Sequence, residues 1–188
     1  YAVLLPAWDE AAVIGDMLRA TLAAWGGRDF RLYVAAYPND VATIAAVGNV
    51  AARDPRVRLA IGERTGPTTK GCNLNVAWRA LCRNEAAEDW HADAVVLHDA
   101  EDLVDRAELA TYDRYLVGHD YVQLPVLPLI ASDSRWVSAH YADEFAEVHH
   151  RNLIIRERLG AGLPLAGTGC AIRRSALDRI ASARGAAP

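Results

Sequence analysis

Short apolar runs alternate with longer amphipathic segments along the first 124 residues. Each apolar run has four or five residues, the length of a buried strand, and most of the segments between them carry apolar residues at helical spacing. Because helices join these short strands, the pattern predicts right-handed βαβ units in a mostly parallel sheet flanked by helices. The fold class is therefore α/β. The expected strands are 2–5, 32–36, 57–61, 94–97 and 121–124.

The expected helices fill the gaps between these strands. They are 10–25, 40–53, 70–87 and 107–117, and the glycine pair at 26–27 ends the first of them. After Pro128 the pattern changes to a long helical stretch at 134–159, an irregular glycine-bearing strand region at 163–172 and a final helix at 175–183.

Composition limits the class of protein. The chain has 188 residues, 52% of them hydrophobic and 23% charged, which is typical of one globular domain. A net charge of −4 without basic runs provides no electrostatic footprint for nucleic acid or for an anionic membrane surface. Three cysteines without C-x-x-C spacing favour a reducing compartment over disulfides or a zinc site. With no bilayer-spanning run and no initial methionine, we expect a soluble piece excised from a longer protein.

An acidic cluster follows the fourth expected strand. Asp99, Glu101 and Asp102 occupy three of four consecutive positions there. Ligands of open α/β sheets bind beyond the carboxyl ends of strands, and hard ions such as Mg²⁺ or Mn²⁺ prefer carboxylate oxygens. The segment alone also fits a solvated acidic turn that caps the next helix, so both interpretations stay open here.

Two further loops follow expected strands. In the first loop, Trp8 could stack on a flat base and Glu10 could accept from its N–H edge, but Asp9 as a simple helix cap explains this segment alone better. In the loop before residue 70, small and hydroxylic residues leave backbone N–H groups for an anion, and Lys70 adds a positive charge. A capped helix with a solvated lysine is the alternative.

One motif in the second half points elsewhere. Glu144, Glu147 and His150 share a helical face, as in half of a di-metal carboxylate site. Such a site needs a matching motif on another helix, and the sequence has none. We therefore expect an exposed polar stripe, and we expect the pair His149 and His150 to lie on the surface.

Taken together, four segments resemble family-two glycosyltransferases, in particular the processive branch with cellulose and hyaluronan synthases. The segments that carry the resemblance are Pro6-Ala7-Trp8-Asp9-Glu10, Lys70-Gly71-Cys72-Asn73-Leu74-Asn75, Asp99-Ala100-Glu101-Asp102 and Gly167-Thr168-Gly169 with Arg173-Arg174. The resemblance implies a GT-A-type nucleotide-diphospho-sugar transferase fold, truncated at its C-terminus. It also implies one domain over 1–188, with a nucleotide-sugar-binding half at 1–128 and a partial acceptor-side half at 129–188.

The resemblance assigns roles to individual residues. Those that would bind the nucleotide sugar are Pro6, Ala7, Trp8, Glu10, Asp40, Lys70, Asn73 and Asp99. Asp99 and Glu101 would stand for the family's Asp-x-Asp and hold Mg²⁺ or Mn²⁺, with Asp102 as a further ligand or a support. Gly167 and Thr168 would border the acceptor, a saccharide or a lipid-linked sugar. The expected donor is a UDP-sugar, and the expected place is the cytoplasmic face of a bacterial inner membrane, reached through other parts of the parent protein.

The chain also departs from the family pattern. Ala35 and Ala36 stand where an Asp-Asp pair usually reads the base, and Asn39 or Asp40 would substitute. The family's catalytic base lies in a Thr-Glu-Asp motif that has not appeared by Pro188, so we expect the base beyond that residue. The prediction is an inverting glycosyltransferase domain. The alternatives are a non-catalytic receptor or scaffold domain of the same fold and a sugar nucleotidyltransferase, which would need a basic glycine-rich first loop.

Overall fold

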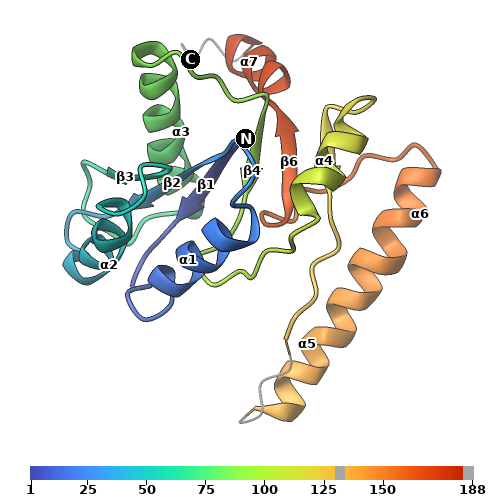
Figure 1. The fold of residues 1–188 in the computed structure, drawn as a ribbon. Coiled ribbons are helices and arrows are strands. Elements are labelled where there is room, and N and C mark those ends of the chain that lie inside the picture. Colours follow the sequence, from blue (N-terminus) through green and yellow to red (C-terminus); the bar gives the residue numbers. More distant parts are fainter. Residues whose placement is uncertain (130–133, 184–188) are drawn as a thin grey trace. The chain divides into compact units, whose positions relative to one another are not determined.

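A computed structural model describes residues 1–129 and 134–183 of the chain. One sheet holds six strands in the order β3-β2-β1-β4-β6-β5 (Figure 1). The pairs β1–β2, β2–β3 and β1–β4 are parallel, as the sequence predicts. The strands are β1 (Ala2–Pro6), β2 (Arg31–Ala36), β3 (Val57–Ile61), β4 (Ala94–Leu97), β5 (Tyr121–Gln123) and β6 (Cys170–Arg173).

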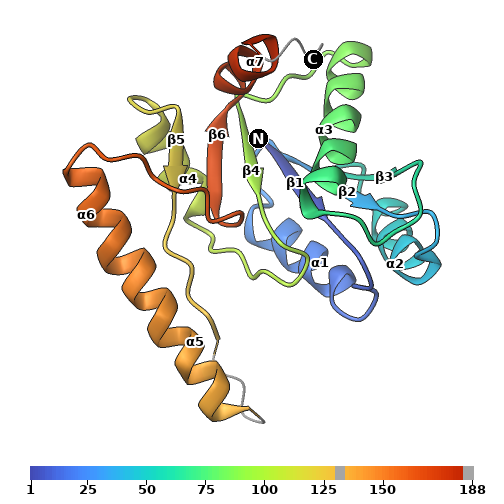
Figure 2. The same cartoon turned by 180° about the vertical axis from the view of Figure 1, so that it is seen from behind.

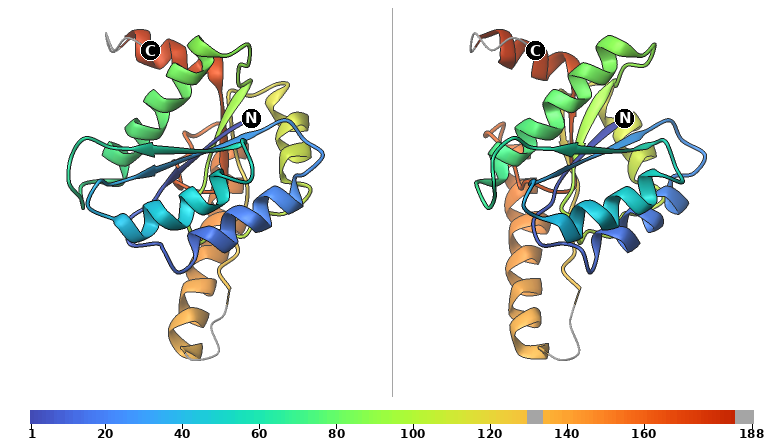
Figure 3. Two further views of the ribbon diagram at one scale, coloured as in Figure 1. Left: turned by 60° about the vertical axis from the view of Figure 1, so that its left-hand side comes forward. Right: turned by 90° about the vertical axis from the view of Figure 1, so that its left-hand side faces the viewer.

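Helices cover both faces of the sheet, as expected for βαβ units. Helices α1 (Ile14–Ala24) and α2 (Val41–Ala51) lie on one face, and α3 (Lys70–Ala87) lies on the other (Figure 3). Helix α3 packs on β1 and β2, which Figure 2 shows from behind. Two further helices, α4 (Glu108–Leu116) and α7 (Arg174–Ala183), complete this part of the chain.

The strand order creates a switch point between β1 and β4. From β1 the chain winds outward to β2 and β3, then returns along α3 to place β4 on the other side of β1. At such a point the loops that follow the two neighbouring strands diverge and leave a crevice for a ligand beyond their carboxyl ends. The loops concerned are those after Pro6 and after Leu97.

Small side chains dominate the core between the sheet and α3. Ala35 on β2 and Ala77 on α3 are fully buried, and Leu81 and Tyr33 fill the remaining space. Alanine at these positions lets the helix approach the strands closely, which fixes the start of α3 relative to the strand ends.

Two compact units form within the chain, Tyr1–Val122 with Ala171–Pro188, and Gln123–Cys170. The second unit contains α5 (Arg135–Glu147), the π-helical turn η1 (Val148–Asn152) and α6 (Leu153–Arg158). These three elements follow one another without a break, which confirms the long helical stretch expected at 134–159. The functional division at residue 128 stays a prediction.

Two expected elements are shorter than predicted. Helix α1 begins at Ile14 rather than at residue 10, because Asp9 has a φ of 59° and the chain turns before the helix starts. In the region 163–172, only residues from Cys170 onward pair as a strand, and Gly167 and Gly169 have positive φ angles. Nothing in residues 1–129 and 134–183 is a helix both long and apolar enough to cross a bilayer.

Candidate functional site

The first loop is held by the start of α2. Asp40 Oδ2 accepts the N–H of Asp9 at 2.7 Å, and Thr43 Oγ1 accepts the N–H of Glu10 at 3.0 Å. Asp40 Oδ1 also accepts the N–H of Thr43 at 3.2 Å, so Asp40 caps α2. Burial alone would raise the pKa of Asp40, but the hydrogen bonds from Asp9 and Thr43 lower it overall. Asp40 therefore fixes the backbone of the first loop as an anion.

This arrangement corrects the alternative in which Asp9 caps α1. The residue that precedes α1 is Val13, and no side chain caps the helix. Because Asp9 lies in the left-handed region, its backbone turns away from helical geometry. The loop is thus built by long-range contacts to α2 and not by a local helix start.

An aromatic pair lines the neighbouring wall. The rings of Trp8 and Tyr37 meet edge to face with centroids 5.3 Å apart, and Trp8 remains 37% exposed while Tyr37 is buried. The Tyr37 hydroxyl lies 2.8 Å from Thr68 Oγ1, and Asn39 makes two hydrogen bonds to the backbone of Gly66. These contacts tie the loop after β2 to the loop after β3.

The start of α3 reaches the same region. Thr69 caps the helix by accepting the N–H of Cys72 at 3.2 Å. Asn73 Nδ2 donates to the carbonyl oxygens of Ala7 and Ala35, each at 3.1 Å, and so joins the ends of β1 and β2 to α3. Asn73 Oδ1 is buried and accepts no hydrogen bond from the described residues. The residue Asn73 lines a cavity of about 400 Å³ together with Tyr37, Thr68, Arg64 and Arg79.

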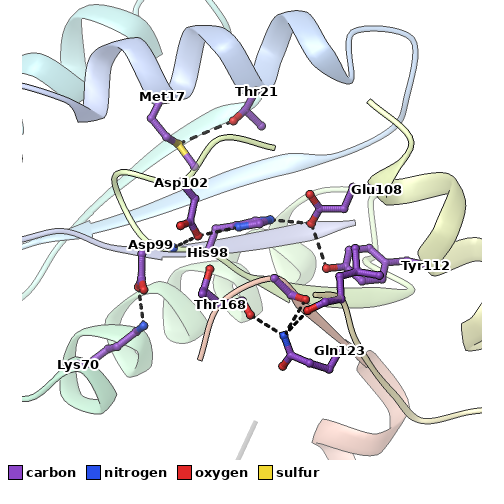
Figure 4. A network of polar contacts seen from close by, with 12 residues as sticks. Met17, Thr21, Lys70, His98, Asp99, Asp102, Glu108, Tyr112, Gln123 and Thr168 are labelled. Carbon is purple, nitrogen blue, oxygen red and sulfur yellow. Dashed lines mark hydrogen bonds and ion pairs between the residues drawn. The ribbon is translucent and has the colours of Figure 1, made fainter. Parts of the chain in front are cut away.

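The acidic cluster forms a tight turn after β4. The N–H of Asp102 donates to the carbonyl oxygen of Asp99 at 3.2 Å, and the N–H of Asp99 donates to Asp102 Oδ2 at 2.8 Å. Lys70 Nζ lies 2.5 Å from Asp99 Oδ1, so the first residue of α3 meets the acidic turn (Figure 4). Lys70 is the only lysine in the sequence. The side chain of Asp102 points toward His98 and not toward Lys70 (Figure 4).

His98 lies buried behind this turn. Its Nδ1 is 3.0 Å from Asp102 Oδ2, and its Nε2 is 2.7 Å from Glu108 Oε1 on α4. Burial alone would lower the pKa of His98, but the hydrogen bonds to Asp102 and Glu108 raise it to about 9. The imidazole is therefore protonated at neutral pH and donates to both carboxylates. Sequence analysis missed this contact; the only signal was a histidine at the end of a buried strand.

Carboxylates crowd the space between the two loops. Burial raises the pKa of Glu10, and the negative charges of Glu101, Asp9, Asp99 and Asp40 raise it further. A site of this charge fits a divalent cation, which would relieve the repulsion. Within the described residues no three His, Cys, Asp or Glu side chains form a complete metal cage. A cation held here would therefore need oxygen ligands beyond these side chains, such as the waters and phosphate oxygens that Mg²⁺ usually takes.

The expected acceptor residues belong to the second unit. Gln123 Nε2 donates to the carbonyl oxygens of Thr168 at 2.9 Å and Gly169 at 3.1 Å, which holds the loop that contains Gly167 (Figure 4). In the first unit, the structure brings together the first loop, Lys70, Asn73 and the acidic turn. The loop of Gly167 and Thr168 belongs to the second unit.

The histidine pair in the second unit needs one correction. His150, Glu144 and Glu147 are exposed, which confirms the polar stripe. His149, expected on the surface, is buried with 5% exposure. The π-helical turn rotates it inward, where its ring stacks on Phe145 with centroids 5.4 Å apart.

Comparisons with known proteins agree with the predicted family. A model of the family described as glycosyltransferase-like family 2 matches residues 1–188. Bacteriophage adsorption protein B of Escherichia coli K12 is 34% identical over 179 residues, which cover 95% of this chain and 24% of the relative. Bacteriophage N4 adsorption protein B of Escherichia coli O157:H7 matches with the same values. The chain thus spans about a quarter of the length of these curated relatives.

Solved structures share the fold. The mannosyltransferase PcManGT from Pyrobaculum calidifontis, in complex with GDP-Man and Mn²⁺, superposes with a TM-score of 0.58 at 20% identity. The match covers 95% of this chain and 46% of that one. TarS 1–349 from S. aureus gives a TM-score of 0.58 at 12% identity, over 95% of this chain and 48% of that one.

These matches confirm the fold class and the family that the four sequence segments predict. The sheet order, the parallel strands and the flanking helices are those of a GT-A-type transferase. The chain is a glycosyltransferase domain and belongs to the glycosyltransferase-like family 2.

Proposed function

We propose that this domain binds a nucleotide-sugar donor in the crevice beyond β1 and β4 and transfers the sugar to an acceptor hydroxyl with inversion. The ion pair of Lys70 with Asp99 is the observation that carries this proposal. It joins a positive charge at a helix N-terminus to the carboxylate of Asp99, and a diphosphate with a bound cation needs both kinds of group. The expected donor is a UDP-sugar.

Asp99 and Glu101 would hold Mg²⁺ or Mn²⁺ together with the donor's diphosphate. When bound, the ion neutralises the charge that develops on the leaving nucleoside diphosphate. Asp102 has one carboxylate oxygen engaged by His98 and by the Asp99 N–H, so we assign it mainly to support the turn. PcManGT, which shares the fold, was solved with Mn²⁺ and GDP-Man.

The first loop would contact the nucleoside. The Trp8 side chain is 37% exposed and would stack on the base, with Pro6 and Ala7 directly before it in the chain. Glu10 would accept from a base or ribose donor. Asp40 would act through the Asp9 backbone that it holds.

Asn73 and Lys70 would complete the donor site from α3. Asn73 lines a cavity large enough for part of a nucleoside, and its Oδ1 is buried without a donor among the described residues. An unsatisfied buried acceptor is costly, so a ligand N–H at this point would stabilise the complex. Lys70 would pass from Asp99 to a phosphate oxygen when the donor binds.

The proposed reaction also needs an acceptor and a general base. Gly167 and Thr168 would border a saccharide or lipid-linked acceptor, and a general base must take the proton from its hydroxyl. We propose that this base follows Pro188, since residues 1–188 contain no Thr-Glu-Asp motif and the curated relatives are about four times as long as the matched stretch. We also propose that the parent protein works at the cytoplasmic face of a bacterial inner membrane.

Calorimetry tests the donor site directly. The chain is titrated with UDP, UDP-sugars and GDP-mannose, with and without Mn²⁺. We expect Mn²⁺-dependent binding that Asp99→Ala abolishes. Asp54→Ala is the matched control, because Asp54 pairs with Arg56 before β3, at the other end of the strands. Donor binding of equal affinity with and without Mn²⁺, or binding that Asp99→Ala leaves unchanged, would contradict the proposal.

A second candidate function is a receptor or scaffold domain without catalysis. Two observations favour it: the fully buried Ala35 and Ala36 where the family usually has acids, and the name of the curated relatives, bacteriophage adsorption protein B. Hydrolysis or transfer assays on a longer form of the protein separate the two. Donor binding with no turnover in that form would favour the receptor function.

A further inference from the structure

A buried chain of polar contacts runs from the acidic turn to α4. Asp102 Oδ2 accepts from the N–H of Asp99 at 2.8 Å and lies 3.0 Å from His98 Nδ1. On the other side of the imidazole, Glu108 Oε1 lies 2.7 Å from His98 Nε2 and accepts from the Tyr112 hydroxyl at 3.0 Å. Figure 4 shows these contacts, and His98, Glu108 and Tyr112 are all buried.

The network is anchored to the sheet at the end of β4. His98 is the first residue after β4, and its N–H reaches the carbonyl oxygen of Leu4 on β1 at 3.3 Å. The imidazole is therefore fixed to the sheet by its own backbone. Trp25 adds a second restraint, with its ring 6.2 Å from His98 and its Nε1 donating to the carbonyl oxygen of Asp105 at 2.9 Å.

One atom connects the network to the site. Asp102 Oδ2 contacts both the His98 ring and the Asp99 N–H, so a displacement of His98 moves the acceptor on which the Asp99 backbone depends. Asp99 itself carries the half-buried carboxylate that pairs with Lys70. The network thus acts on the orientation of Asp99 without touching its carboxylate.

We propose that His98 is a positioning residue, which Glu108 orients and which holds the Asp99–Asp102 turn in the geometry that receives the cation and diphosphate. The inference rests on the proposed function, because it takes Asp99 as a ligand-binding residue. Groups that orient ligand side chains from behind typically change metal affinity by about 10- to 100-fold when they are replaced. We expect a loss of this size here.

Another buried carboxylate in the same unit offers a matched control. Glu85 accepts the N–H of Ala92 at 3.0 Å and pairs with Arg174 at 2.9 Å, away from the acidic turn. Glu85 and Glu108 are similarly buried. Replacing either by glutamine removes one buried negative charge with little change in shape, so both variants report a general loss of stability. Of these two glutamates, only Glu108 contacts His98.

The test compares His98→Asn, Glu108→Gln and Glu85→Gln with the unchanged 188-residue chain. Mn²⁺ affinity is measured by electron paramagnetic resonance in the presence of UDP, and in a second series with GDP, well below each variant's unfolding temperature. Hydrogen exchange of the amides of Asp99 and Asp102 is followed in parallel. We expect His98→Asn and Glu108→Gln to weaken Mn²⁺ binding about tenfold or more and to speed amide exchange, while Glu85→Gln changes neither.

Each outcome decides between the claims. If the unchanged chain binds no Mn²⁺ with either nucleotide, the proposed function fails, and the positioning role fails with it. If it binds Mn²⁺ but Glu108→Gln and Glu85→Gln behave alike, the donor site stands and the positioning role is wrong. Faster amide exchange in His98→Asn with unchanged Mn²⁺ affinity also overturns the positioning role, because the turn would then move without consequence for the ion.

Discussion

Lys70 and Asp99 form an ion pair, with 2.5 Å between Nζ and Oδ1, that connects the first residue of α3 to the turn after β4. Lys70 begins the helix that precedes β4 and Asp99 follows β4, and the sequence contains no other lysine. An ammonium group at this place competes with a metal ion for Asp99 and attracts phosphate. Lys70 should therefore weaken the binding of a metal ion alone and strengthen the binding of a phosphate ligand. A substitution of Lys70 can distinguish these two effects.

Replacing Lys70 by methionine should separate these effects. Without the ammonium group, Asp99 is free for a cation, so Mn²⁺ alone should bind more tightly. UDP in the presence of Mn²⁺ should bind about tenfold or more weakly, because a charge-assisted hydrogen bond contributes roughly 1.5–3 kcal/mol. Calorimetric titrations with Mn²⁺ alone and with Mn²⁺ and UDP measure both. Parallel changes of the two affinities would show that Lys70 does not stand between the metal and the phosphate.

Asp9 should tolerate glycine but not valine. Its φ of 59° lies in the left-handed region, which costs a β-branched residue about 1–2 kcal/mol and costs glycine little. Urea denaturation should therefore show a loss of about this size for Asp9→Val and a near-neutral result for Asp9→Gly. Both variants keep the N–H that Asp40 accepts. Equal stability of the two would mean that the loop relaxes to another backbone conformation.

Adding a methyl group at Gly66 should destabilise the fold. A Cβ at this position would lie 2.4 Å from Tyr37 Cγ, closer than side chains approach one another. Gly66→Ala should lower the free energy of unfolding by about 1–3 kcal/mol, the usual effect of overpacking. Gly48→Ala is the control, because a Cβ there has open space within α2 and should increase stability by up to about 1 kcal/mol. Urea denaturation of both variants measures the difference.

The stability of the domain should depend on pH through His98. Its pKa is raised from an ordinary value of 6.5 to about 9 because Asp102 and Glu108 accept its two N–H groups. A raised pKa means that the folded state binds the proton more tightly, so the stabilisation is complete below about pH 6.5 and is lost as pH rises through about 9. Urea denaturation in buffer with a chelator should show this decline.

Two variants identify the origin of the decline. His98→Asn should flatten the profile between pH 6.5 and 9, because no imidazole remains to release the proton. Glu85→Gln should lower stability while keeping the slope of the unchanged chain, because Glu85 pairs with Arg174 and not with His98. A slope that survives in His98→Asn would assign the pH dependence to another group.

Local signals in the sequence predicted most of the first unit. Strands β3 and β4 and helix α3 have the predicted bounds, because strong apolar runs and the capping residue Thr69 mark their ends. The predicted start of α1 was wrong, because the backbone N–H of Asp9 is held by the carboxylate of Asp40, which is 31 residues away. The inward turn of His149 was missed for a similar reason, since a π-helical turn shifts the face that each following residue occupies.

Periodicity and residue types by themselves determined an α/β sheet and a cluster of acids after the fourth strand, and the resemblance of four sequence segments to a known family predicted the family. Only the tertiary structure decided that Lys70 meets Asp99, that Asp40 holds the first loop, and that His98 lies between Asp102 and Glu108. The reason is physical. Which loops become neighbours depends on the order of strands in the sheet, and which carboxylates face outward depends on side-chain directions that no spacing of residues encodes.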